Sequence, residues 1–299
     1  MLKNKKILFI VNPVSGVKDN KLIEQTITPH LNNHKLDFDI IYTSKSGYAK
    51  HYVHTMDSGV YNSILILGGD GTINEILNGI LSRVDGYIPI LGFLPGGTGN
   101  AVLHNLKYLD PILALQPMLH KHTKFIDVMI LKFPNAVEYS INILGWGLVS
   151  DIAILAEKLR FIGQSRYNLA SLYGILKLKA RECTLIIDNK KYHNQYLFIL
   201  IQNTIYTGKA MKTAPQAKLD DGLIDILLVS KDANKLQMLI LLSKLSNGSH
   251  IQSEYVEYMQ VKNIELIPKI NEAVNIDGDI KHMTPVKISV LEKKLPIYY

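Results

Sequence analysis

The sequence predicts an α/β domain with a parallel sheet, followed by a β-sandwich domain. In the first 124 residues, short apolar runs alternate with helical segments, which is typical of a parallel sheet covered by helices. After that point, apolar runs follow one another at short intervals, which indicates antiparallel strands. With 299 residues, of which 47% are hydrophobic, the chain is long enough for two cores. We therefore expect domains at residues 1–124 and 125–299.

The first domain contains four predicted strands and the helices that connect them. The strands are expected at residues 7–11, 38–43, 63–67 and 89–94, and the helices at 21–31, at 47–56, from 73 onward and from 101 onward. Loops that follow three of these strands are rich in glycine and polar residues: Asn12–Gly16, Gly68–Thr72 and Pro95–Asn100. Ligands of such sheets bind beyond the carboxyl ends of the strands, so these loops predict a common binding site.

The loop around Asp70 is the centre of this predicted site. Three glycines in four residues lie between the end of a strand and the start of a helix. Thr72 and Glu75 match the T-x-x-E capping box that begins a helix. Glycine lets a ligand approach the backbone, and a helix start attracts phosphate. Asp70 then suggests a nearby cation or hydroxyl proton, although a tight turn with a capping aspartate explains the same residues.

The second domain is predicted to be mostly strands. They are expected at residues 125–133, 138–145, 184–188, 195–203, 223–229, 261–267, 273–276 and 286–291, with helices at 148–160 and 234–245. Two acidic turns, Asp220–Asp225 and Asp277–Asp279, enter or join strands. Each alone is typical of a turn. Together with two glycine-rich loops they favour phosphoryl transfer, which uses backbone donors, Mg²⁺ on oxygen ligands and a carboxylate near the attacking hydroxyl.

Composition excludes several classes of protein. The net charge of +7 suits an anionic partner, but the basic residues are scattered, so we expect no nucleic acid as partner. A single cysteine, Cys183, indicates a reducing, cytoplasmic setting. No P-loop or complete dinucleotide motif occurs, the histidines lack metal-ligand spacing, and no apolar run is long enough to span a membrane. The sequence does not predict an oligomeric state.

Five motifs, in order along nearly the whole chain, resemble the diacylglycerol kinase catalytic-domain family, which also includes sphingosine and ceramide kinases. Residues 68–75 resemble its GGDGTxNE signature, and residues 95–100 resemble PxGTxN. Residues 12–16 are similar to the opening NPxSG, residues 218–225 to a DGxLD segment of bacterial members, and residues 277–279 to a late DGE. The resemblance implies an NAD kinase-like α/β nucleotide-binding domain and a β-sandwich lipid-substrate domain whose last strands return to the first domain.

The same resemblance implies a lipid kinase that uses ATP and Mg²⁺. The γ-phosphate of ATP would pass to the hydroxyl of a diacylglycerol- or sphingoid-like lipid, with transient contact at a membrane surface. The implied ATP-binding residues are Asn12, Thr43, Gly68, Gly69, Asp70, Gly71, Thr72, Ile73, Asn74, Gly97, Thr98 and Asn100. The implied Mg²⁺ ligands are the carbonyls of Lys218 and Leu223 and the carboxylate of Asp221. Asp279 would stand at the catalytic base, and Asp70, in the same acidic network, would act through catalytic Mg²⁺ or on the hydroxyl proton itself, so either aspartate could be the general base.

Two positions depart from the family pattern. Asp279 replaces the usual Glu and is shorter by one methylene, and Ala101 replaces an aspartate that bacterial members carry after PxGTxN. Asn100-Ala101 instead resembles the sphingosine kinases, as does the segment from Gly145 to Tyr167. By that resemblance Asp151 would contact the polar head of the lipid, whereas a helix start would also explain a carboxylate there.

Two alternatives remain open at this stage. An NAD kinase-like enzyme with a soluble acceptor also uses a GGDGT loop, although the PxGTxN segment and residues 146–167 argue against it. A non-catalytic nucleotide or lipid sensor would account for Ala101 and Asp279.

Overall fold

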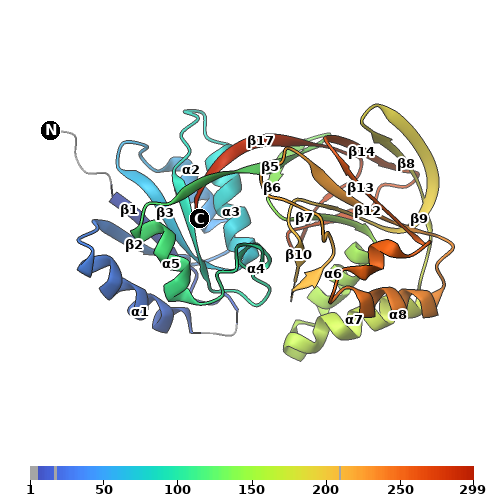
Figure 1. The fold of residues 1–299 in the computed structure, drawn as a ribbon, viewed down its shortest axis with the longest axis horizontal. Coiled ribbons are helices and arrows are strands. Elements are labelled where there is room, and N and C mark those ends of the chain that lie inside the picture. The colour runs from blue at the N-terminus through green and yellow to red at the C-terminus, as the bar shows by residue number, and fades with distance from the viewer. Residues whose placement is uncertain (1–5, 17–18, 209) are drawn as a thin grey trace. The chain divides into compact units, whose positions relative to one another are not determined.

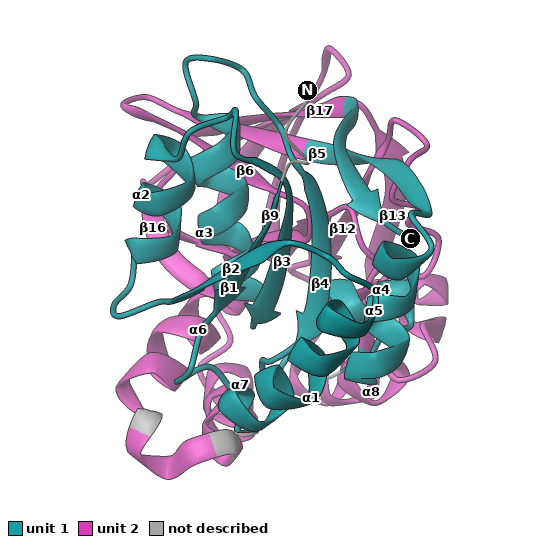
Figure 2. Cartoon of the chain, turned by 90° about the vertical axis from the view of Figure 1, so that its left-hand side faces the viewer, with its two compact units in different colours: residues 1–128, 208–210, 292–299 teal, residues 129–207, 211–291 magenta. Residues whose placement is uncertain are grey.

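The computed structural model describes residues 6–16, 19–208 and 210–299 (Figure 1). The chain divides into two compact units, coloured separately in Figure 2. Unit 1 comprises Met1–Val128, Gly208–Ala210 and Glu292–Tyr299, and unit 2 comprises Met129–Thr207 and Met211–Leu291.

Unit 1 is built on a parallel sheet with strand order β4-β3-β1-β2. Its elements are β1 (Lys6–Val11), α1 (Asn20–Asn33), β2 (Phe38–Tyr42), α2 (Tyr48–Thr55), β3 (Tyr61–Gly68), α3 (Asp70–Leu81), β4 (Ile90–Pro95), α4 (Ala101–Leu106) and α5 (Pro111–Leu119). The end of β17 (Val286–Tyr298) joins this sheet through the parallel pair Ile297 and Leu91. The predicted parallel α/β fold is therefore confirmed.

Both faces of this sheet are buried, which explains the continuous apolar runs of its strands. Ile7, Phe9 and Val11 of β1 pack in one core with α1 and α5. The alternate residues Leu8 and Ile10 are also fully buried. α2 packs against α3, and Figure 2 shows this pair on the side of the sheet opposite α1 and α5. Covered on both faces, the sheet leaves its carboxyl edge for the loops that carry the predicted site.

Unit 2 is a β-sandwich with antiparallel strand pairs and three α-helices among its described residues. Its elements are β5 (Thr123–Phe133, beginning in unit 1), β6 (Ala136–Ser140), β7 (Ile143–Gly147), α6 (Leu148–Lys158), η1 (Arg160–Ser165), α7 (Arg166–Leu176), β8 (Arg181–Ile187), β9 (Lys190–Gln202), β10 (Tyr206–Thr207), β11 (Met211–Lys212), β12 (Ile224–Ser230), α8 (Lys235–Lys244), η2 (Ser249–Gln252), β13 (Val256–Val261), β14 (Asn263–Pro268), β15 (Ala273–Ile276), β16 (Asp279–Met283) and the first part of β17. The long strand β9 pairs with β8 along its first half and with β7 and β12 along its second half.

Two cores hold unit 2 together. The main core lies between strands and contains the fully buried Trp146 on β7. The second core forms where α6, α7 and α8 cover β7, β9 and β12, with Leu148, Ile175 and Met238 among its members. None of the helices in the described residues is long and apolar enough to cross a membrane.

Two of the predicted strands are each divided in the structure. Residues 138–145 form the end of β6 and the start of β7, because Ser140 Oγ accepts the N–H of Asn142 (3.1 Å) and bends the chain between them. Residues 261–267 fall on β13 and β14. The break comes at Lys262, whose backbone N–H donates to the Asp188 carboxylate (3.2 Å) rather than to a neighbouring strand. At both points a side-chain acceptor takes the backbone N–H, and the hydrogen-bond ladder between the strands ends there.

α7 does not follow from the sequence pattern. Its buried residues are Ala170, Gly174 and Ile175, so two of the three are small. A Cβ at position 174 would lie 2.8 Å from Leu148 of α6, which shows how closely the two helices approach. A helix that packs through small residues does not show the apolar inner stripe on which helix prediction depends.

Candidate active site

The loop between β3 and α3 ends a buried strand and begins a helix within two residues. Gly69 is the N-cap residue of α3, in extended conformation (φ −93°, ψ −178°), and no side chain caps the helix. The predicted capping box of Thr72 and Glu75 is therefore wrong. The helix begins at Asp70, so Thr72 lies inside its first turn rather than before it.

Thr72 and Glu75 instead tie the helix to other parts of unit 1. The Asn12 side-chain amide donates to Thr72 Oγ1 (2.9 Å). The backbone N–H of Gly47 donates to Glu75 Oε1 (2.8 Å), at the start of α2. These bonds hold the loop after β1 and the start of α2 against α3.

The loop after β4 is closed by Asn100. Its side-chain oxygen accepts the N–H of Gly97 (2.9 Å), and its side-chain amide donates to the Gly97 carbonyl (2.9 Å). Asn100 itself is in the left-handed region (φ 50°, ψ 41°). Thr98, between these residues, is exposed. The loop thus turns back on itself and presents Thr98 outward.

The two glycine loops pack backbone to backbone. A Cβ at Gly97 would lie 2.4 Å from Gly69 Cα, and a Cβ at Gly96 would lie 2.7 Å from Gly68 N. The N–H of Gly96 donates to the carbonyl of Gly68 (3.2 Å). No side chain larger than hydrogen fits at these contacts without moving a loop, so glycine is required there for close approach.

The first loop, Asn12–Gly16, is fixed to the same cluster by Asn20 and Ser15. The fully buried Asn20 side chain donates to the carbonyls of Asn12 (2.8 Å) and Gly96 (3.0 Å), and Ser15 Oγ donates to the Gly96 carbonyl (2.8 Å). The N–H of Thr43, after β2, donates to the carbonyl of Val11 (2.9 Å). The structure thus brings the predicted ATP-binding residues together at the carboxyl edge of the unit 1 sheet.

Asn20 is a site residue that the sequence analysis missed. It is the first residue of α1, a position where asparagine looks like an ordinary helix-start residue. Only its complete burial and its bonds to two loops show that it positions them.

Asp70 is the acidic group of this loop cluster. Its carboxylate points toward the start of α4, where a Cβ at Gly99 would lie 2.9 Å from Asp70 Oδ2. Burial raises the pKa of Asp70, with backbone N–H groups of Ala101 and Val102 opposing the shift. Burial also lowers the pKa of His104, and the nearby Asp70 charge works against that shift. Ionised Asp70 would therefore gain from a bound cation.

A hollow of about 400 Å³ lies beside the first loop. It is lined by Pro13, Lys21, Glu24, Gln25 and Tyr42. Pro13 lies in the loop after β1 and Tyr42 is the last residue of β2, so this hollow adjoins Asn12 and Thr43. Its walls combine an exposed aromatic ring with both signs of charge.

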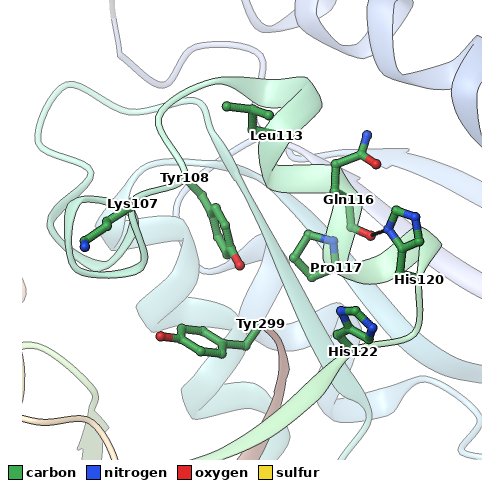
Figure 3. A pocket seen from close by; sticks show the side chains of 8 residues that line it. All are labelled: Lys107, Tyr108, Leu113, Gln116, Pro117, His120, His122 and Tyr299. Atoms are coloured by element: carbon green, nitrogen blue, oxygen red, sulfur yellow. Dashed lines mark hydrogen bonds between the residues drawn. The ribbon is translucent and has the colours of Figure 1, made fainter.

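A second pocket of unit 1, of about 290 Å³, contains none of the predicted site residues (Figure 3). It is lined by Lys107, Tyr108, Leu113, Gln116, Pro117, His120, His122 and Tyr299. In Figure 3 the rings of Tyr108 and Tyr299 face the same space as the two histidines. Its walls come from the segment after α4, from α5 and from the C-terminus, away from the glycine loops in sequence.

In unit 2, Asp279 stands at the end of a two-residue hairpin turn. Asp277 (φ 51°) and Gly278 (φ 99°) connect β15 to β16, and both have the left-handed conformation that this turn requires. The buried Asp277 carboxylate accepts Ser140 Oγ (2.7 Å) and the N–H of Ile143 (2.9 Å). The Asp279 side chain is 52% exposed, with Lys281 Nζ at 3.4 Å. Asp277 anchors the turn, while Asp279 faces outward.

The predicted metal-binding residues lie in the loop before β12. Asp221 Oδ1 accepts the N–H of Leu223 (3.1 Å) around Gly222, which has a φ of 73°. Lys218 is exposed in the same loop. Among the described residues, no three His, Cys, Asp or Glu side chains are grouped to hold a metal ion. The predicted Mg²⁺ site is not a group of this kind, because its expected ligands are two backbone carbonyls and only one carboxylate.

Two carboxylates are buried on strands, and only Asp225 belongs to an acidic turn noted from the sequence. Asp225, on β12, accepts the Tyr258 hydroxyl and the Gln260 side-chain amide, and burial raises its pKa to about 6. Asp127, on β5, is fully buried and accepts the N–H of Lys293 (2.6 Å). Each occurs within an apolar strand, where an acidic residue is itself an unusual signal.

Asp151 lies in the first turn of α6 and forms an ion pair. Arg181 Nη2 is 2.5 Å from Asp151 Oδ2, and Arg181 Nε is 2.9 Å from Glu272 Oε1. The Asp151 side chain is 48% exposed, whereas that of Arg181 is only 11% exposed. The α6 helix contacts β15 and β16, the strands of the Asp279 hairpin.

The fold matches solved structures over almost the whole chain. A Bacillus anthracis structure described as that of a candidate diacylglycerol kinase superposes with a TM-score of 0.83 at 26% identity, covering 99% of this chain and 98% of that chain. An NAD kinase from Archaeoglobus fulgidus, solved in complex with ATP, has a TM-score of 0.53 at 11% identity over 98% of this chain and 93% of its own. The second match shows a likeness of fold alone.

Two family models cover most of the sequence. Residues 6–131 match the diacylglycerol kinase catalytic domain, and residues 143–299 match the YegS C-terminal NAD kinase beta sandwich-like domain. The match to the diacylglycerol kinase catalytic domain places the chain in the class of lipid kinases. The chain belongs to the diacylglycerol kinase family, which confirms the resemblance seen in its motifs.

Named relatives come from both branches of this family. Sphingosine kinase 1 of Arabidopsis thaliana is 28% identical over 334 residues, which are 92% of this chain and 68% of the plant protein. Sphingosine kinase 2 of the same plant is covered over 65% of its length. A diacylglycerol kinase of Staphylococcus epidermidis is 26% identical over 98% of this chain and 92% of its own.

Proposed function

We propose that this protein is an ATP- and Mg²⁺-dependent lipid kinase that phosphorylates the hydroxyl of a diacylglycerol- or sphingoid-like lipid. The observation that carries the proposal is the cluster of three loops locked together at the first turn of α3, with Asp70 among them. Membership of the diacylglycerol kinase family supports a lipid acceptor over a soluble one.

The loop cluster fits the polyphosphate of ATP. Gly68 and Gly69 let the loop pack closely on Thr72 and Gly97, and the first turn of α3 supplies N–H groups that lack partners within the helix. Asn12, Thr43 and Thr98 would surround the phosphates. The hollow beside Pro13 and Tyr42 is proposed to receive the nucleoside.

Two groups fit Mg²⁺. Asp70 carries a carboxylate whose charge is disfavoured by burial, so a cation beside it is stabilising. In unit 2, Asp221 and the carbonyls of Lys218 and Leu223 are oxygen donors of the type that Mg²⁺ prefers. When bound, Mg²⁺ neutralises phosphate charge at the first group, and at the second it would stabilise the loop before β12.

Asp279 is proposed as the proton acceptor. The lipid oxygen forms a bond to the γ-phosphorus, the bond from that phosphorus to the leaving ADP oxygen breaks, and the hydroxyl proton passes to the Asp279 carboxylate. Its exposure at the end of an anchored hairpin suits a group that must meet substrate. Asp70 would act through Mg²⁺ rather than on the proton.

Asp151 is proposed to contact the head of the lipid. Arg181 pairs with both Asp151 and Glu272, so these three side chains keep one net negative charge, and the free Asp151 oxygen can accept a hydrogen bond from a hydroxyl or an ammonium group. Removing the Arg181 charge should raise the activity toward a sphingoid base relative to the activity toward diacylglycerol.

The two predicted domains would divide this work. Residues 1–124 would bind ATP and residues 125–299 would bind the lipid, with the C-terminal residues returning to the first domain, as residues 292–299 do in unit 1. We place the protein in the cytoplasm, with transient contact at membrane surfaces where its substrate resides.

The test is phosphate transfer from labelled ATP to a panel of diacylglycerol, sphingosine and NAD. Wild-type protein should label a lipid, and Asp70→Ala should not. Asp70→Ala should retain a cooperative unfolding transition, since the change removes no apolar side chain from a core. Transfer by Asp70→Ala at the wild-type rate, or labelling of NAD alone, would contradict the proposal.

A further inference from the structure

The pocket shown in Figure 3 is a concave site of unit 1 that the proposed function does not use. Its volume is about 290 Å³, close to the lower limit of the roughly 300–1,000 Å³ that ligand pockets occupy. Four of its lining side chains carry flat aromatic rings: Tyr108, His120, His122 and Tyr299. We call this hollow the tyrosine–histidine pocket. Its size suits a ligand that places one or two rings inside and leaves the rest of the molecule outside.

The aromatic rings form two pairs on different walls of the pocket. The ring centres of Tyr108 and Tyr299 are 6.5 Å apart, and those of His120 and His122 are 5.9 Å apart. Figure 3 shows the tyrosine rings on one side of the space and the histidine rings on the other, with Pro117 beside the histidines. Nucleobases stack on tyrosine and histidine rings, whatever the base, because every base has a π-face. These walls therefore suit a flat, heteroaromatic ring.

Two polar atoms of the pocket suit the edge of a base. Burial raises the pKa of Tyr108, so at neutral pH its hydroxyl keeps its proton and can donate. His120 Nδ1 lies 2.9 Å from the Gln116 carbonyl, and because a carbonyl can only accept, this nitrogen carries the proton and leaves Nε2 as an acceptor. A base edge presents both donors and acceptors, whereas an acyl chain would cover these atoms without giving them partners.

The charges around the pocket favour an anion. Residues 107–124 contain three lysines and two histidines but a single acidic residue, Asp110. The Asp110 carboxylate is the N-cap of α5, where it accepts two backbone N–H groups of the helix (2.9 Å each). Lys107, which lines the pocket, is exposed, and Lys124 Nζ lies 4.8 Å from the centre of the Tyr299 ring. A ring that carries phosphate groups would therefore match both the walls and the border of the pocket.

We propose that the tyrosine–histidine pocket binds a nucleotide, with its base against the tyrosine and histidine rings and its phosphates at the bordering lysines. This site differs from the proposed ATP site, because none of its lining residues belongs to the glycine loops or to the loop after β1. Its α5 wall lies on the side of the unit 1 sheet opposite α3. The proposal does not depend on the lipid kinase function and would hold for a protein that transfers no phosphate.

The test is equilibrium dialysis with radiolabelled ADP, which has no γ-phosphate to transfer. Wild-type protein should bind ADP at two classes of site, one at the glycine loops and one at the tyrosine–histidine pocket. The double variant His122→Ala, Tyr299→Leu should bind ADP at least about tenfold more weakly at one class and unchanged at the other, because stacking of a base on an aromatic ring contributes about that much. Both side chains are exposed, so the variant should unfold at the wild-type temperature.

His51→Ala is the matched control. His51 is an exposed histidine of α2, outside both sites, and its variant should bind ADP at both classes as the wild type does. Lys107→Gln tests the phosphate end of the site. At the class that the double variant loses, it should weaken the binding of ADP and leave the binding of adenosine unchanged, because adenosine carries no phosphate. Equal weakening of ADP and adenosine would contradict a phosphate contact at Lys107.

Photo-crosslinking gives a measurement that needs no variant. With 8-azido-ADP, wild-type protein should be labelled within residues 107–124 or at Tyr299, as mass spectrometry of its peptides would show. Labelling confined to the glycine loops would overturn the proposal. So would a single class of ADP site, or two classes, that the double variant leaves unchanged.

Gly97→Ala separates this site from the proposed kinase site. It should weaken the class of ADP site at the glycine loops and leave the other class unchanged. A single class of site that only the double variant removes would contradict ATP binding at the glycine loops, and with it the kinase proposal. That result would leave the tyrosine–histidine pocket as a nucleotide site.

Discussion

Gly97→Ala tests whether the two glycine loops form one rigid phosphate-binding cradle. Its Cβ would lie 2.4 Å from Gly69 Cα and 2.9 Å from Asn100 Oδ1. Non-bonded carbon atoms prefer a separation of about 3.5 Å or more, so one loop must move by about 1 Å. The nearest atom belongs to the backbone of the neighbouring loop, so rotation of a flexible side chain cannot relieve the contact.

The expected effect is much larger on activity than on stability. Overpacking of this kind costs about 1–3 kcal/mol of unfolding free energy, which a domain of ordinary stability survives. A displacement of about 1 Å in a group that positions substrate lowers the rate about 100-fold. We therefore expect kcat/KM for ATP to fall by about two orders of magnitude in a protein that still folds.

The assay compares initial rates of lipid phosphorylation over a range of ATP concentrations, together with urea unfolding. Gly59→Ala is the control, because its Cβ would lie 3.2 Å from an Asp57 side-chain oxygen in an exposed turn of unit 1. That variant should match the wild type in both measurements. Wild-type kcat/KM in Gly97→Ala would refute the idea that the packed loops hold the phosphates.

Three further predictions concern the acidic turns of unit 2. Asp279→Asn should abolish transfer while Asp279→Glu retains it, as measured by kcat with saturating substrates; equal loss in both would argue against proton acceptance. Mg²⁺ should raise the thermal midpoint of the wild type but not of Asp221→Ala, and the same rise in both would contradict the metal site. The pKa of Asp225 is raised by burial from 3.8 to about 6, so the folded protein binds more protons than the unfolded chain between those values. The free energy of unfolding should therefore fall as pH rises through this window, and it should fall less in Asp225→Asn. Urea unfolding at each pH measures this free energy. The same pH profile in both proteins would contradict burial as the cause.

The parallel half of the fold could be predicted because its strands are buried on both faces. Such burial produces apolar runs like Ile64–Leu67, and the loops after these runs must meet at one edge. The cluster of Asn12, Gly68 and Gly97 follows from that topology alone.

Contacts between residues that are far apart in the sequence could not be predicted from the sequence pattern. Thr72 and Glu75 have the spacing of a capping box, but their partners Asn12 and Gly47 are 60 and 28 residues away. Asn20 looks like a helix start and proves to be a buried link between loops. Spacing in the sequence indicates only which residues are neighbours along the chain. These roles depend on contacts with residues that are distant in the sequence.

α7 shows a second reason for failure. Helix prediction assumes that large apolar residues face inward, and here Leu172 and Leu176 face outward while Gly174 lies against α6. Apolar residues do recur at helical spacing in this segment, but they lie on the exposed side of the helix.

In the hairpin at residues 277–279, one aspartate holds the turn in place and the other is available for chemistry. Asp277 is 8% exposed and its carboxylate accepts hydrogen bonds from Ser140 and Ile143, so it cannot move without breaking these bonds. Gly278 supplies the positive φ that reverses the chain. Asp279 is thereby presented from a fixed point, and the length of its own side chain sets its reach. The change from Glu to Asp at this position therefore shortens the reach by one methylene, with no flexible turn to compensate. If Asp279 accepts the proton, the lipid hydroxyl must come one methylene closer to the hairpin, and Asp279→Glu should then bind the natural lipid less tightly while still turning it over.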